Sequence, residues 1–132
     1  MAYPFYPTFR NLFINGTNTS SGGAEMTNIV PCRAKYVSTM VTIRSSGGGT
    51  SGFDVFGYQN ALGGASTSSP TITIITSGQS VTTTTGNVTF EVGSTLTGPV
   101  VIFNKGDLIG ISASTGVGNA LGWAYTHTFQ EF

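Results

Sequence analysis

The stretch Asn119-Ala-Leu-Gly-Trp-Ala-Tyr-Thr-His-Thr-Phe-Gln-Glu-Phe132 decides the fold class of this chain. Every second side chain in it is large: Leu121, Trp123, Tyr125, His127 and Phe129. The residues between them are small or polar: Gly122, Ala124, Thr126, Thr128 and Gln130. Because side chains alternate between the two faces of a strand, this pattern predicts one β-strand with an aromatic face and a polar face. We expect the aromatic face to be buried, either in the domain core or against another subunit.

The rest of the chain repeats short apolar and β-branched segments between Gly-, Ser- and Thr-rich runs. We predict strands over residues 12–14, 26–32, 35–44, 53–59, 71–76, 81–85, 88–92, 99–103, 107–113 and 119–132. A turn is expected at Asn15-Gly16, and the runs 45–52 and 63–70 are expected to be loops. No stretch has helical spacing over about ten residues. About eight to ten short strands with Gly-rich turns predict an all-β sandwich or barrel.

The predicted strand 35–44 has a mixed pattern. Strict alternation places Val37, Val41 and Ile43 on one face. The same alternation places Tyr36, Ser38, Met40 and Thr42 on the other face. We therefore expect the valine and isoleucine side chains to face the same way.

A tight turn is predicted at Asn104-Lys105-Gly106, just before the strand that begins at Asp107. Gly106 tolerates the positive φ that such a turn needs. The Asp107 carboxylate can accept hydrogen bonds from nearby backbone amides as the chain enters the strand. We therefore assign Gly106 and Asp107 a structural role.

The composition is poor in charge. Of 132 residues, 8% are charged, with five Lys or Arg and five Asp or Glu, and the formal net charge is zero. Ordinary globular proteins have about 25% charged residues. Nucleic-acid binding requires a basic patch, and membrane-surface binding requires basic residues or an amphipathic helix, so we predict neither. The lone Cys32 cannot form an internal disulfide, and we expect synthesis in a reducing cytoplasm.

The same composition favours self-association. A neutral surface is a poor means of keeping a free protein dispersed, and it suits a protein held inside an assembly. Sandwich edges are commonly protected by Lys, which occurs here only at Lys35 and Lys105. We therefore predict that partner chains cover the edges.

Residues 1–10 differ from the remainder, which we predict to be a single domain over 11–132. Tyr3-Pro4 and Tyr6-Pro7 favour an extended arm, because proline lacks the backbone donor and restricts the residue before it. The arm is rich in aromatic side chains: Tyr3, Phe5, Tyr6 and Phe9. Two hypotheses follow, namely that the arm folds back onto its own sandwich or that it docks on a neighbouring protein.

No motif for catalysis, metal binding or a cofactor is present in the sequence. His127 is the only histidine, and no Gly-x-Ser-x-Gly nucleophile sequence accompanies it. One Cys, one His and five scattered acids do not form a metal-ligand cluster or an assignable pair of catalytic carboxylates. We predict a non-enzymatic protein without a cofactor. Sugar binding stays open, with Tyr58, Asn60 and Trp123 as candidate contacts.

Three segments, taken in order, resemble a known group of proteins. The strand Tyr36–Ile43 precedes a Gly-rich loop, and residues 100–111 contain the sequence Lys105-Gly106-Asp107 before an apolar strand. A loop at 114–118 then leads to the terminal strand, which ends in Phe129-Gln-Glu-Phe132. Over about residues 28–132 this order resembles the jelly-roll domains of bacteriophage virion proteins, which occur in capsid decoration proteins, head fibres and tail-fibre tips. These are similar in outline to the trimeric jelly rolls of the tumour-necrosis-factor and C1q type.

The resemblance implies a fold and a role. It implies an antiparallel jelly-roll β-sandwich, assembled as a homotrimer, in a capsid decoration or cement protein on the virion surface. The expected partners are further copies of the chain and the major capsid protein, with Tyr3, Phe5, Tyr6 and Phe9 contacting the capsid. The alternative is a receptor- or glycan-binding tip of a phage tail or head fibre.

Overall fold

The computed structural model describes residues 10–18, 25–45, 49–59, 71–83, 86–92, 101–115 and 120–131. Within these ranges the chain is all β, and no described residue is helical. The strands are β1 (Asn11–Asn18), β2 (Met26–Ile29), β3 (Ala34–Ser45), β4 (Gly49–Gln59), β5 (Thr71–Thr83), β6 (Gly86–Val92), β7 (Ile102–Phe103), β8 (Leu108–Thr115) and β9 (Ala120–Glu131).

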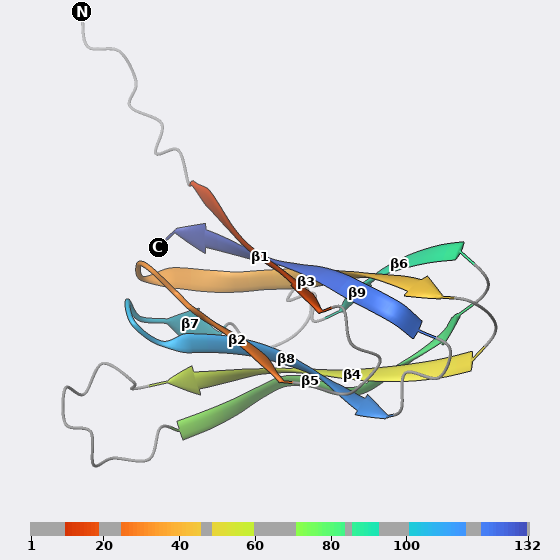
Figure 1. The fold of residues 1–132 in the computed structure, drawn as a ribbon. Coiled ribbons are helices and arrows are strands. Elements are labelled where there is room, and N and C mark those ends of the chain that lie inside the picture. The colour runs from red at the N-terminus through yellow and green to blue at the C-terminus, as the bar shows by residue number, and fades with distance from the viewer. Residues whose placement is uncertain are drawn as a thin grey trace, which may run out of the picture.

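The strands form two antiparallel sheets that lie face to face (Figure 1). One sheet has the order β1-β9-β3-β6, with the short β7 also paired to β3. The other sheet has the order β2-β8-β4-β5. The predicted all-β sandwich is thereby confirmed.

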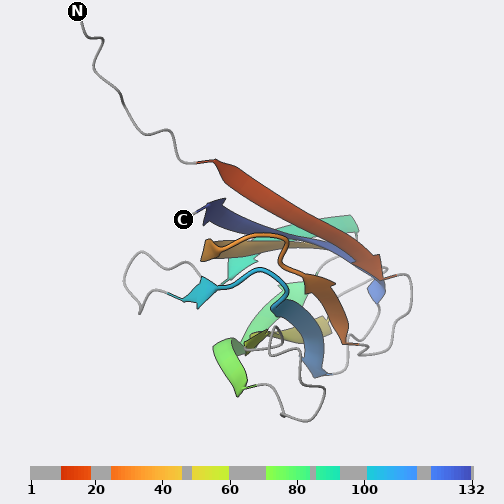
Figure 2. The same cartoon turned by 90° about the vertical axis from the view of Figure 1, so that its left-hand side faces the viewer.

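The pairing identifies the sandwich as a jelly roll. Going outward from the β4–β5 connection and leaving out the short β7, successive strands pair with each other: β4 with β5, β3 with β6, β2 with β8, and β1 with β9. The chain is therefore one long antiparallel ribbon, rolled up so that β9 also pairs with β3 and β8 also pairs with β4. Figure 2 shows β1 and β9 side by side along one margin of the sandwich.

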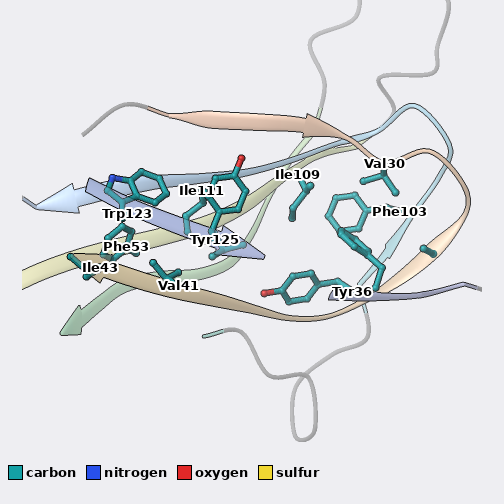
Figure 3. Close-up of a cluster of buried hydrophobic side chains, with 13 residues drawn as sticks. Val30, Tyr36, Val41, Ile43, Phe53, Phe103, Ile109, Ile111, Trp123 and Tyr125 are labelled. Atoms are coloured by element: carbon teal, nitrogen blue, oxygen red, sulfur yellow. The ribbon is translucent and has the colours of Figure 1, made fainter. Parts of the chain in front are cut away.

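The core lies between the sheets and is lined by aromatic rings (Figure 3). At one end, the Phe53 ring packs edge-on against Trp123 with a centroid distance of 5.3 Å. At the other end, Phe129 makes edge contacts with Tyr36 at 5.7 Å and with Phe103 at 5.6 Å. Edge-to-face pairs of this kind add to the stabilisation from apolar burial. Aliphatic side chains complete the same cluster: Val30, Val41, Ile43, Val55, Ile109 and Ile111.

The predicted faces of β3 are wrong at its first half. The register with β9 shifts between Tyr36 and Ser38, so one residue is inserted into β3. A bulge of this kind reverses the side-chain alternation beyond it. Tyr36 consequently faces the core together with Val41 and Ile43, whereas Ser38 and Met40 lie on the outer face with register partners Thr128 and Thr126.

Several predicted boundaries also change. No turn occurs at Asn15-Gly16, because β1 continues to Asn18 along β9. The strand β4 begins at Gly49, inside the predicted loop 45–52. The two predicted strands at 71–76 and 81–85 are one strand, β5, whose register with β4 shifts on either side of Val55. Of the predicted strand 99–103, Ile102–Phe103 forms β7, Val101 precedes it, and residues 99–100 lie outside the described part.

Candidate functional site

The aromatic face of β9 lies in the domain core. Trp123, Tyr125, His127 and Phe129 are all buried. The backbone of Leu121 belongs to β9, but its side chain lies outside the described part. The four buried side chains have almost no surface that a second subunit could touch. A subunit interface must therefore use the outward surface of the sandwich.

Polar side chains inside the core form one hydrogen-bonded chain. Thr39 Oγ1 lies 2.7 Å from Tyr36 Oη and 2.7 Å from His127 Nδ1. His127 Nε2 is buried and has no hydrogen-bond partner among the described residues. Burial lowers the pKa of His127 to about 3, because the cationic imidazolium is poorly solvated there. Burial likewise raises the pKa of Tyr36. Both groups are neutral at physiological pH.

The Thr39–His127 pair resembles the hydroxyl–imidazole pair of nucleophilic enzymes. A nucleophile must meet its substrate, yet both residues have no exposed surface. An imidazole with a pKa of about 3 is also a weak general base near neutral pH. The pair is therefore a structural element of the core.

Tyr125 connects the two sheets near their β1 and β2 edges. Its hydroxyl accepts a hydrogen bond of 2.5 Å from Asn28 Nδ2 on β2. The ring reaches this position by crossing Gly16, its register partner on β1. A Cβ atom at Gly16 would overlap the Tyr125 hydroxyl and ring, so glycine provides the necessary space.

The turn before β8 is built by the residues that the sequence singled out. Gly106 has a φ of 92°, a conformation that favours glycine. Asp107 Oδ2 accepts a hydrogen bond of 2.8 Å from the Asn104 amide. Backbone hydrogen bonds of 2.8 Å from Gly106 N to Val30 O and from Val30 N to Asp107 O join the turn to the end of β2. This turn is a structural feature that holds β8 against β2.

The outer face of the β1-β9-β3-β6 sheet is rich in hydroxyl groups, and we call it the threonine face. Its described outward side chains are Asn11, Phe13, Asn15, Thr17, Lys35, Ser38, Met40, Thr42, Arg44, Thr89, Glu91, Ala124, Thr126, Thr128 and Gln130. Phe13 is 58% exposed and Met40 is 48% exposed. They lie on either side of Thr126 and Thr128 in the central strand β9. This face therefore has two exposed apolar side chains on either side of uncharged threonine residues.

The outer face of the β2-β8-β4-β5 sheet, which we call the Tyr58 face, is covered differently. Phe56 lies against Gly110 of β8 and is only 7% exposed. The Tyr58 ring packs edge-on against Phe56 at 5.3 Å, and its hydroxyl donates a hydrogen bond of 2.9 Å to Glu25 Oε1. This hydrogen bond is the main cause of the raised pKa of Tyr58. Phe56 is thus already covered within the chain, and Ile29 is the exposed large apolar residue among the described side chains of this face.

The other predicted site residues are not brought together. Tyr3, Phe5, Tyr6 and Phe9 lie outside the described residues, which begin with Arg10 beside Glu131. Of the sugar-contact candidates, Trp123 is in the core, Tyr58 is on the Tyr58 face, and Asn60 lies outside the described part.

The described residues contain neither a metal-ligand cluster nor a membrane-spanning helix. In the described ranges, no three His, Cys, Asp or Glu side chains are grouped so that they could hold a metal ion. Those ranges also contain no helix with the length and hydropathy needed to cross a bilayer.

Phe13, Met40 and Ile29 are exposed apolar residues that were not predicted from the sequence. The predicted strand around Phe13 covered only residues 12–14, which is too short to show an alternation of faces, whereas β1 extends to Asn18. Extending the alternation of β9 to its neighbours would have indicated it, since Phe13 pairs with the outward Thr128.

Comparison with known proteins adds no family assignment. Neither the models of known families nor the curated proteins include a match to this chain. Function must therefore be argued from the fold and its surfaces.

Proposed function

We propose that this chain is a non-enzymatic structural protein of a bacteriophage virion, which decorates and stabilises the capsid shell as a homo-oligomer. The observation that carries the proposal is the distribution of side-chain chemistry in the jelly roll. The hydroxyl–imidazole pair of Thr39 and His127 is buried, whereas the chain has no formal net charge and its described surface carries exposed apolar residues. A surface of this kind favours packing onto other proteins.

The resemblance to virion jelly rolls and the neutral composition support the same role. A trimer is the expected oligomer under this proposal, and the major capsid protein is its expected partner. Residues 1–9 precede Arg10, whose backbone carbonyl accepts a 2.8 Å hydrogen bond from Glu131 N at the end of β9. Under the proposal, Tyr3, Phe5, Tyr6 and Phe9 anchor this end of the sandwich to the shell. Repeated anchors on one oligomer strengthen attachment through avidity.

Attachment to capsid shells tests the proposal. Purified chain is mixed with shells of the phage that encodes it, and shell-bound protein is measured by co-sedimentation. We expect wild-type protein to bind and a variant lacking residues 1–9 to bind much less while keeping its far-UV circular dichroism spectrum. The matched control replaces Asn15, on the outward side of β1, by Ala and should bind as the wild type does.

The position of the chain in the intact particle distinguishes the alternative. Electron cryo-microscopy showing many copies on the shell would support decoration. A few copies at a tail or fibre would overturn it and support a glycan-binding tip, for which Tyr58 is the described aromatic candidate on an outward face.

A further inference from the structure

The two outward faces differ in what covers their large apolar side chains. On the Tyr58 face, Phe56 is already covered by Tyr58, which is held by Glu25. On the threonine face, Phe13 and Met40 stay 58% and 48% exposed. Exposed apolar side chains on a sheet favour burial against another surface.

The backbone of the inner strands of the threonine face is already hydrogen-bonded within the sheet. Its two inner strands, β9 and β3, are paired on both sides, so their backbone amides and carbonyls are used within the sheet. On its surface, Thr42 Oγ1 and Thr89 Oγ1 already hydrogen-bond to each other at 2.8 Å. Polar groups that are satisfied within the chain lower the cost of removing water from the surface.

Charge is confined to the periphery of this face. Glu91 lies on the edge strand β6, and Lys35 and Arg44 lie near the two ends of β3. On β1, β9 and β3 the described side chains between these ends are neutral, and Glu91 is the register partner of Met40 on β6. The chain also has a formal net charge of zero, so two copies do not repel each other. A neutral face matches another neutral surface, which further copies of this chain provide.

The face is large enough for a stable contact. The strands β1, β9, β3 and β6 are 8, 12, 12 and 7 residues long. At ~3.4 Å per residue and about 4.8 Å between strands, they cover together an area of roughly 600 Å². Two such surfaces together bury about 1,200 Å², which exceeds the ~1,000 Å² expected of a biological interface.

We infer that a second copy of this chain covers the threonine face, through contacts centred on Met40, Thr126, Thr128 and Phe13. The inference rests on the homo-oligomer of the proposed function and identifies its interface. In a twofold dimer the face meets itself, whereas in a ring of three it meets a different surface of the next copy. The measured mass distinguishes these two arrangements, and both satisfy the inference.

The test measures the mass of the purified full chain by sedimentation velocity and light scattering between about 1 and 100 µM, a range suited to weak and moderate association. Wild-type protein is expected to be oligomeric. Met40→Glu should weaken association by about 100-fold or more, because a buried unpaired carboxylate is strongly unfavourable. Phe13→Lys provides a second, independent variant on another strand of the same face.

The matched control is Ile29→Glu. Ile29 is 66% exposed, more than Met40, but it lies on the Tyr58 face. This variant should keep the wild-type mass in a twofold dimer, whereas its dissociation in a ring of three would place the Tyr58 face opposite the threonine face and support the inference. The inference is overturned by a monomeric wild type at the highest concentration, by folded Met40 and Phe13 variants of unchanged mass, or by dissociation of the Ile29 variant when the wild type is a dimer. Since no shell is present, these results are independent of the attachment experiment.

Discussion

The two sides of β9 differ in side-chain size and burial, although their residues alternate along one strand. The inward side carries Trp123, Tyr125, His127 and Phe129, all buried among the rings of the core. The outward side carries Ala124, Thr126 and Thr128, which face away from it. The aromatic side chains of β9 therefore stabilise the domain core, whereas its small and hydroxyl-bearing side chains are available for contact with other molecules. The predictions below test this division by comparing changes on the two sides.

The largest effect is expected for Phe129→Ala. Phe129 has no exposed surface and contacts the rings of Tyr36 and Phe103, so its removal leaves a cavity. The free energy of unfolding should fall by about 3–5 kcal/mol. Urea denaturation at one fixed protein concentration measures the change, since association also stabilises the fold. Thr128→Ala, one residue away on the outward side, should change the value by less than about 0.5 kcal/mol. Equal effects of the two substitutions would contradict the division.

The second prediction concerns pH. Burial lowers the pKa of His127 from its ordinary 6.5 to about 3, so between these values the unfolded chain binds a proton that the folded chain does not. Stability is therefore fully present above pH 6.5 and is lost as the pH falls, by up to about 1.4 kcal/mol per pH unit. From pH 6.5 to pH 5 the loss should approach ~2 kcal/mol.

The control for pH uses the fact that His127 is the only histidine. His127→Leu should unfold with a much smaller pH dependence between pH 6.5 and pH 5, because no other side chain with an ordinary pKa titrates through that range. An unchanged slope in this variant would assign the pH dependence to another group.

A smaller effect is expected for Gly16→Ala. The added methyl group would overlap the Tyr125 ring, which must then move away from Asn28. The free energy of unfolding should fall by about 1–3 kcal/mol. Thr17→Ala, at the next and outward-facing position of β1, is the matched control and should be nearly neutral in the same denaturation experiment. An unchanged free energy of unfolding for Gly16→Ala would show that the Tyr125 ring can adopt another position at no cost.

The smallest effect is expected for Asn28→Ala, which removes the hydrogen bond between the sheets at Tyr125. The expected loss is about 1 kcal/mol. Tyr125→Phe removes the other partner, so a double-mutant cycle isolates the coupling of the two groups. Additive losses in the cycle would mean that the hydrogen bond contributes no coupling energy.

Much of the fold was predictable because the alternation of apolar and polar residues and the glycine-rich turns are local features of the sequence. The inward set of β9 and the turn at Gly106-Asp107 agree with the structure. The faces of β3 were not predictable, because the bulge between Tyr36 and Ser38 is determined by pairing with β9, far away in the chain. The glycine at position 16 indicated a turn locally, but its actual partner is the Tyr125 ring across the sheet.

The candidate surface was less predictable than the fold. Periodicity shows that Trp123 and Thr126 lie on opposite sides of a strand, but not what packs against either side. Only the second sheet decides that the aromatic side is the core side. Residues 1–9 stay a sequence-based hypothesis, since they lie outside the described residues.

The strand order also has a consequence for synthesis. β9 follows all the other strands in the chain, yet it occupies an inner position of its sheet, between β1 and β3. A nascent chain therefore cannot close that sheet before its final strand has left the ribosome. Until then β1 lacks its neighbour, and the core side of β3 lacks the rings that β9 contributes. Such chains expose unpaired edges and apolar surface, so slow production or chaperone protection during translation should increase the yield of native protein.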